Sequence, residues 1–199
     1  MVHRQSLRGN GMEKAFIRKY TQSDRENVRK VCIDTADASF KKSKKMLECV
    51  PIIYNDYFTE QEPENIFVID GGDGKAVGYI LCSADFEKFV KMNREIYLKR
   101  LLKTHLPSAA VLLMYTYQLK KIKRNSVHLH IDILPEFQHS GFGTQLIDTL
   151  CRHLKENGHT TLSVCGISRN SGAYGFYTKC GFHEIYSYGA GTVSLAKNL

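Results

Sequence analysis

The fold is decided by Gln138-His139-Ser140-Gly141-Phe142-Gly143, which joins a run with the pattern of a strand to a run with the pattern of a helix. Before this turn, residues 127–133 alternate apolar and polar side chains with a period of two. After it, apolar residues recur at helical spacing through 144–156, and Gly158 follows as a stop signal. Such a glycine turn leaves unpaired N–H groups at the positive end of a helix, which predicts a phosphate-binding site.

Patterns in the rest of the chain predict further strands and helices. Strands are expected over residues 15–20, 66–70, 76–84, 160–166, 182–188 and 192–196. Helices are expected over residues 24–36, 43–58, 86–106, 109–122 and 171–179. Pro107 and Ser108 are expected to break the helical pattern between the third and the fourth of these helices. Because hairpin signals such as Gly71-Gly72-Asp73-Gly74 join several strands, we expect an α/β (α+β) fold with a mixed sheet flanked by helices.

Length and composition favour one globular domain. The chain has 199 residues, of which 43% are hydrophobic and 24% charged, and this suits a single core. Its longest apolar stretches are too short to cross a membrane. Residues 1–11 are basic and polar without the apolar segment of a secretory signal, so we expect a disordered leader followed by one domain over 12–199.

Cysteine usage and charge limit the compartment and the partners. None of the six cysteines forms a C-x-x-C pair, which favours reduced thiols and a cytoplasmic protein. The net charge of +8 suits either nucleic acid or a small polyanionic cofactor. Lysine-rich runs occur at 41–45 and 120–124, but no aromatic base-stacking pattern accompanies them. We therefore expect neither nucleic acid nor a membrane as a partner.

A second pattern follows the glycine turn, at residues 170–182. With it, the chain resembles the GNAT superfamily of acyl-CoA-dependent N-acetyltransferases. The family's Q/R-x-x-G-x-G/A motif matches at Gln138, Gly141 and Gly143. Its later N-x-x-A-x-x-F-Y-x-K-x-G-F pattern matches at Asn170, Ala173, Phe176, Tyr177, Lys179, Gly181 and Phe182. The segment 128–135 is also similar to bacterial GNAT proteins related to the acetyltransferase-like domain of O-GlcNAcase, and such domains are not all demonstrably active.

The resemblance implies a mostly antiparallel sheet whose splayed central strands hold acetyl-CoA as acyl donor. The pyrophosphate would lie on backbone N–H groups of the glycine turn, and the pantetheine would run along the strand 131–133. Contacts with the donor are then expected at Ile131, Ile133, Gln138, His139, Ser140, Gly141, Phe142, Gly143, Thr144, Asn170, Ala173, Phe176 and Tyr177.

Catalysis of amine acetylation needs a proton acceptor and a proton donor. Tyr177 matches the family tyrosine that protonates the departing thiolate, although a simply packed tyrosine would also fit the pattern. His128, His130 and Asp132 alternate onto one face of their strand. Asp132 and His130 are our candidates for the base, and a satisfied hydrogen-bond network is the alternative. An H-x-H-x-D pattern can also supply metal ligands, but no further ligand is evident in the sequence, so we expect no metal.

Residues 86–124 exceed the short connection that the family commonly has there, and their helical pattern predicts an insert. The insert would cover the acceptor cleft, contact a second copy or only extend the packing, so either a monomer or a homodimer is expected. The function we expect is direct acetyl transfer, in a ternary complex, to a primary amine on a small molecule or a protein. The alternative is a catalytically silent acyl-CoA-binding or interaction module.

Overall fold

The computed structural model describes residues 14–122, 127–189 and 191–199. Its seven strands form one sheet in the order β1-β2-β3-β4-β5-β7-β6. Every neighbouring pair is antiparallel except β4 and β5, which confirms a mixed, mostly antiparallel sheet. The strands are β1 (Phe16–Lys19), β2 (Phe67–Asp70), β3 (Ala76–Ser83), β4 (Val127–Ile133), β5 (Thr161–Ser168), β6 (His183–Ser187) and β7 (Thr192–Asn198).

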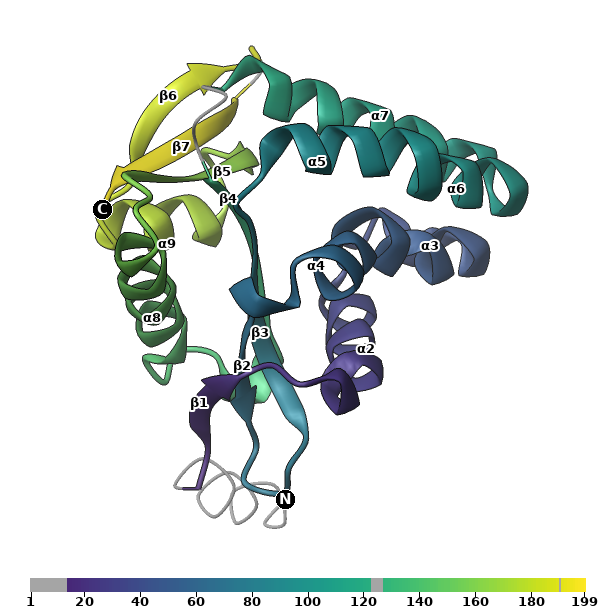
Figure 1. Cartoon of the computed structure of the whole chain (residues 1–199). Helices are drawn as coiled ribbons and strands as arrows, with labels where there is room; N and C mark the ends of the chain where they lie inside the picture. Colours follow the sequence, from purple (N-terminus) through teal and green to yellow (C-terminus); the bar gives the residue numbers. More distant parts are fainter. Residues whose placement is uncertain (1–13, 123–126, 190) are drawn as a thin grey trace.

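Helices cover both faces of the sheet and enclose two hydrophobic cores (Figure 1). On one face lie α2 (Arg25–Thr35), α3 (Lys44–Tyr54), α4 (Asp56–Gln61), α5 (Phe86–Met92), α6 (Leu98–Thr104) and α7 (Leu106–Lys121). On the other face lie α8 (Phe142–Glu156) and α9 (Gly172–Lys179). Alternation along β3 sends Tyr79 and Leu81 into the first core and Ile80 into the second. Short 3-10 turns span Gln22–Asp24, Phe40–Lys42, Pro63–Asn65 and Pro135–Phe137.

The central strands β4 and β5 part soon after they meet. They pair only at Val127–Leu162 and His128–Ser163, whereas β4 pairs with β3 from His128 to Ile133. A bulge in β5 between Val164 and Ile167 accompanies the separation. The expected splay is confirmed, and it leaves the β5 side of residues 129–133 without a neighbouring strand among the residues that the structure describes.

The second predicted helix is divided in the structure. The helix expected over 43–58 is instead α3 and α4, because Asn55 between them has a non-helical backbone with φ −131° and ψ −51°.

The insert departs from prediction in its internal breaks. The helix expected over 86–106 consists of α5, a π-helical segment at Asn93–Tyr97 and α6. The expected break between two helices is present, but it falls at His105, between α6 and α7, rather than at Pro107 and Ser108. Pro107 occupies the first turn of α7, where its missing N–H has no intrahelical acceptor to lose. Residues 123–124, the end of the predicted insert, lie outside the described residues, as does the predicted leader 1–11.

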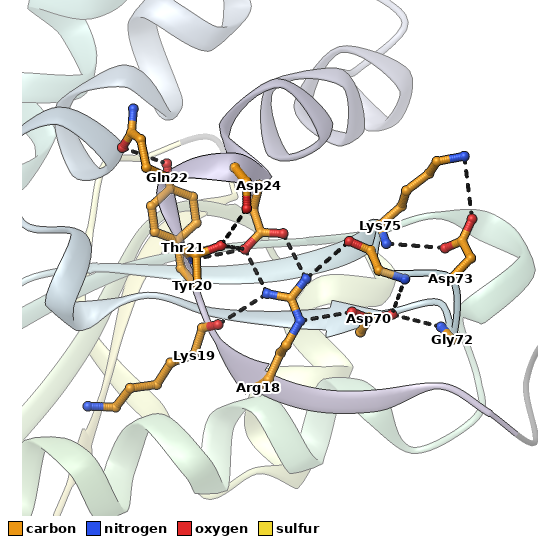
Figure 2. A network of polar contacts seen from close by, with 12 residues as sticks. Arg18, Lys19, Tyr20, Thr21, Gln22, Asp24, Asp70, Gly72, Asp73 and Lys75 are labelled. Atoms are coloured by element: carbon orange, nitrogen blue, oxygen red, sulfur yellow. Dashed lines mark hydrogen bonds and ion pairs between the residues drawn. The ribbon is translucent and has the colours of Figure 1, made fainter.

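The first strand and the first helix are fixed together by Arg18 (Figure 2). Its guanidinium contacts Asp24 at 2.7 Å, at the start of α2, and Asp70 at 2.8 Å, at the end of β2. Asp70 in turn accepts backbone N–H bonds from Gly72 and Gly74 in the β2–β3 turn. The first strand, the start of α2 and the end of β2 are thereby joined at one edge of the sheet, and α2 is held in place above β3 and β4.

The described cysteines are all free thiols, three buried and three half-buried. This agrees with the expectation of reduced cysteines. Within the described residues, no helix has both the length and the apolar character needed to cross a membrane.

Candidate active site

The glycine turn between β4 and α8 adopts the conformation that the sequence predicts. Gly141 has φ +87°, a left-handed value that favours glycine, and caps the N-terminus of α8. The first intrahelical bond runs from Gln145 N–H to Gly141 C=O. The N–H groups of residues 142–144 therefore precede the hydrogen-bonded part of the helix and are the natural donors to an anion.

Gly143 is required by a close approach rather than by its dihedral angles. A Cβ built at this position would lie 3.0 Å from the ring of Phe176 on α9. The two glycine-bearing segments that the sequence patterns single out therefore meet in space. Gln138 secures the turn from the other end, because its Nε2 donates to the carbonyl of Ile133 at 2.7 Å.

A cavity of about 620 Å³ lies where β4 and β5 part. It is lined by Thr35, Ile131, Asp132, Ile133, Gln138, His139, Gly141, Gly143, Thr144, Gly172, Ala173, Phe176 and Tyr177. Most of the residues expected to contact the donor are thus brought to one hollow. Three are not part of its lining: the side chain of Phe142 is buried in a core, Ser140 donates to the carbonyl of Phe137, and Asn170 is exposed.

Asp132 is held by two neighbours at the inner end of this cavity. The hydroxyl of Tyr79 donates to its Oδ2 at 2.5 Å, and His130 Nε2 lies 3.0 Å from the same oxygen. The imidazole of His130 stacks on Tyr54 with ring centroids 5.3 Å apart and an interplanar angle of 13°. Burial and the nearby carboxylate keep the pKa of Tyr79 well above its usual value, so this phenol stays a hydrogen-bond donor.

A second, smaller cavity of about 200 Å³ adjoins the first. Its lining comprises Cys32, Thr35, Ala36, Asp37, Phe40, Val50, Tyr54, His130 and Asp132. Thr35 and Asp132 belong to both cavities, so these two residues mark where the hollows meet. The sequence patterns did not single out Cys32, Thr35, Tyr54 or Tyr79, since each sits within an ordinary amphipathic helix or buried strand.

His128 takes no part in this polar group. It is 1% exposed, surrounded by the rings of Phe58, Phe89 and Tyr115, and neither ring nitrogen has a partner among the described residues. Burial, and then the nearby His130, lower the pKa of His128 from 6.5 to about 3. His128 is therefore neutral at ordinary pH. Of the three polar side chains on this face of β4, His130 and Asp132 line a cavity and His128 does not.

Tyr177 lines the larger cavity from α9 and is 4% exposed. It packs between Phe176 and Phe182, with centroids 5.2 and 5.3 Å away. Burial, reinforced by the charge of Asp132, raises the pKa of this phenol. Tyr177 therefore remains protonated and able to donate.

The central strands part around a cavity, and the cavity ends at a glycine-capped helix N-terminus. This arrangement is that of enzymes that take an acyl group from coenzyme A. The model of the acetyltransferase (GNAT) family matches residues 33–182, and the chain belongs to this family, whose members transfer acetyl groups from acetyl-CoA. The mixed sheet and its helices are the GNAT fold.

Solved structures agree with this assignment. The crystal structure of SsHAT is similar at 30% identity and a TM-score of 0.81, over 93% of this chain and 98% of that chain. PH1933 from Pyrococcus horikoshii OT3 has 17% identity and a TM-score of 0.65 over the same shares of each chain. The PaiA N-acetyltransferase from Thermoplasma acidophilum, solved in complex with coenzyme A, has 16% identity and a TM-score of 0.60 over 93% of this chain and 99% of that chain. The last two likenesses concern the fold alone, and the O-GlcNAcase-related subgroup stays a prediction.

Proposed function

We propose that the protein is a cytoplasmic N-acetyltransferase that moves an acetyl group from acetyl-CoA to a primary amine, by direct transfer in a ternary complex. The observation that carries this proposal is the position of Asp132, which lines both cavities. A donor in the larger cavity and an amine in the smaller one would meet beside a carboxylate.

The larger cavity supplies the groups that a coenzyme A thioester needs. Backbone N–H groups at the start of α8 suit the pyrophosphate, and Gly141 and Gly143 leave room for its approach. The open side of β4 at residues 131–133 offers backbone groups to the amide-containing pantetheine arm. A backbone N–H near Ile133 would then polarise the thioester carbonyl.

The reaction needs two proton transfers, one from the acceptor amine and one to the departing thiolate. Asp132, with His130 beside it, takes the proton that the acceptor amine must lose, either directly or through water. The amine nitrogen bonds to the acetyl carbon, and the carbon–sulfur bond breaks as the tetrahedral intermediate collapses. Tyr177 gives its proton to the departing thiolate, since its raised pKa keeps it protonated. When the products leave, Asp132 gives up its proton to solvent and Tyr177 regains one, so both groups return to their starting states.

Direct transfer is favoured because the cavity thiol is a poor nucleophile. Cys32 lines the smaller cavity, but burial raises its pKa and the charge of Asp132 raises it further. A thiolate, the reactive form, is therefore strongly disfavoured at Cys32. Acylation of this residue is not expected, and a covalent enzyme intermediate has no other support.

The first test is thermal unfolding with and without acetyl-CoA, with NAD as the control ligand. At about 100-fold excess over its dissociation constant, acetyl-CoA should stabilise the protein by roughly 2.7 kcal/mol, whereas NAD should not. A panel of primary amines then separates an enzyme from a binding module. Binding of acetyl-CoA without acetyl transfer to any amine would favour the silent module, and absence of a thermal shift would contradict the proposal at its first step.

A further inference from the structure

We propose that Cys32, His130 and Asp132 form a binding site for a divalent transition-metal ion of the zinc type. One ligand atom from each residue, the thiol sulfur, an imidazole nitrogen and a carboxylate oxygen, lies within 4.8 Å of the other two. Two of these residues come from β4 and the third from α2. The sequence lacked a further ligand for the H-x-H-x-D pattern, and the fold supplies it from a helix almost a hundred residues away.

The chemistry of the three ligands selects the ion. Thiolate, imidazole and carboxylate are the usual ligands of Zn²⁺. Cys32 is a thiol while no ion is bound, so the ion would displace its proton to solvent, and the resulting thiolate and the carboxylate would balance the charge of the ion. A thiolate with an imidazole disfavours Mg²⁺ and Ca²⁺, which prefer oxygen ligands alone. In a tetrahedral zinc site neighbouring ligand atoms lie about 3.3–3.7 Å apart, so separations within 4.8 Å need only small side-chain shifts.

Neighbouring side chains already fix two of the ligands. Tyr54 stacks on the imidazole of His130 and sets its plane. The phenol of Tyr79 donates to Asp132, which is how second-shell groups commonly orient a carboxylate ligand. Arg18 anchors the start of α2, the helix that carries Cys32. The cluster is thus held from the strand side and from the helix side before any ion arrives.

The remaining coordination position would face the smaller cavity, which all three ligands line. Three protein ligands and one open position are typical of zinc sites that bind an exchangeable group. A bound ion would also coordinate the Asp132 oxygen and the His130 nitrogen, the atoms that the proposed function uses to take the proton of the acceptor amine. The metal and the amine would therefore exclude one another, while acetyl-CoA in the larger cavity would still bind.

Cobalt(II) provides the direct test, because a thiolate ligand gives it an ultraviolet charge-transfer band and tetrahedral geometry gives it intense visible bands. The full chain without an affinity tag is titrated with Co²⁺ and then with Zn²⁺. We expect one equivalent of Co²⁺ to produce both bands, Zn²⁺ to abolish them, and excess Mg²⁺ to leave them unchanged. A wild-type protein without the thiolate band would overturn the proposal and leave the cluster as a hydrogen-bonded network.

Variants locate the site. The charge-transfer band should be lost in Cys32→Ser and retained in Cys151→Ser, a half-buried cysteine packed against the opposite core. A band that persists in Cys32→Ser would place the ion elsewhere and contradict the site. Acetyl-CoA should still raise the unfolding temperature of Cys32→Ser, which shows that the variant is folded. If acetyl-CoA fails to stabilise even the wild-type protein, the proposed function fails, whereas the cobalt spectrum still decides on the metal.

Discussion

At the scale of single residues, Asp132 depends on Tyr79, a side chain that no sequence pattern marked. The variant Tyr79→Phe removes the hydroxyl that donates to the carboxylate. The carboxylate then loses a hydrogen bond that holds it in place for proton transfer, so kcat/KM should fall while acetyl-CoA still binds. Because hydrogen bonds to charged groups contribute about 1.5–3 kcal/mol, we expect kcat/KM near neutral pH to fall roughly tenfold or more.

The matched control for Tyr79 is Tyr97→Phe. Tyr97 is also fully buried and also donates to a carboxylate, that of Glu60 at 3.0 Å, but it lines neither cavity. Removal of the Tyr97 hydroxyl should leave kcat/KM unchanged. An unaltered kcat/KM in Tyr79→Phe, with acetyl-CoA binding intact, would show that this tyrosine does not position the base.

The lowered pKa of His128 leads to a prediction about stability rather than activity. Its pKa is about 3 in the folded protein and near 6.5 in the unfolded chain, so the unfolded state binds more protons between these values. Stability should therefore fall as pH drops below 6.5, by about 2 kcal/mol from this residue at pH 5. His128→Leu should flatten this dependence in urea unfolding measured at pH 5 and pH 7.5. An equal pH dependence in both proteins would contradict the depressed pKa.

The residues of the site divide into those that local pattern reveals and those that only the fold reveals. Alternation along β4 marks His130 and Asp132, because the period of a strand can be read from the sequence. Cys32 and Tyr54 reach the same place from α2 and α3, and nothing in a helical pattern says which turn faces a cavity. Pattern also could not separate His128 from His130, since the difference lies in the rings packed around His128.

At the scale of elements, the junction of α8 with α9 carries the binding prediction. In Gly143→Ala the new methyl group would meet the ring of Phe176 at 3.0 Å and narrow the larger cavity. We expect about tenfold weaker acetyl-CoA binding by calorimetry. The fold itself should not suffer, because alanine favours a helix over glycine by up to about 1 kcal/mol.

Gly175→Ala on α9 is the control, since nothing lies within 4 Å of a Cβ built there. It should bind acetyl-CoA as the wild-type protein does. Equal affinity in both variants would mean that the close contact of α8 with α9 has no role in holding the donor.

Most helices and strands could be predicted because their periodicity can be read from the local sequence. The missed helix breaks occur where a single residue or tertiary packing interrupts that periodicity. The break at Asn55 follows from a single backbone conformation within an apolar stretch that reads as continuous. The π-helical segment before α6 coincides with Asn93, whose buried side chain donates to the carbonyl of Phe89. The parting of β4 from β5 was expected only through the family resemblance, because period two describes a strand but not its neighbours.

At the scale of the whole molecule, the Arg18 cluster predicts sensitivity to acid. Burial alone would raise the pKa of Asp70 and Asp24, but hydrogen bonds from Arg18 and from backbone N–H groups together outweigh it and hold both pKa values below 3.8. Their contribution is therefore present above that pH and lost as the pH falls through the lowered values. Arg18→Ala, which leaves two carboxylates that are 2% and 5% exposed without their cation, should lower the unfolding temperature at pH 7 by roughly 5 °C.

A surface pair provides the comparison for Arg18. Lys30 and Asp34 are 71% and 40% exposed, and such a pair contributes at most about 0.5 kcal/mol. Lys30→Ala should hardly change the unfolding temperature. Similar small effects from both variants would mean that the cluster in Figure 2 is screened by water and does not hold the sheet edge to α2.

The gap between β4 and β5 leaves the sheet with an internal edge that no strand of the described chain covers. An uncovered edge opens more readily than a paired one and exposes the chain to proteases and to other strands. A thioester whose amide groups fill that gap would act as the absent strand. The lifetime of this protein in a cell should then rise and fall with the supply of acetyl-CoA, so that its abundance reports the metabolic state of the cell before any amine is modified.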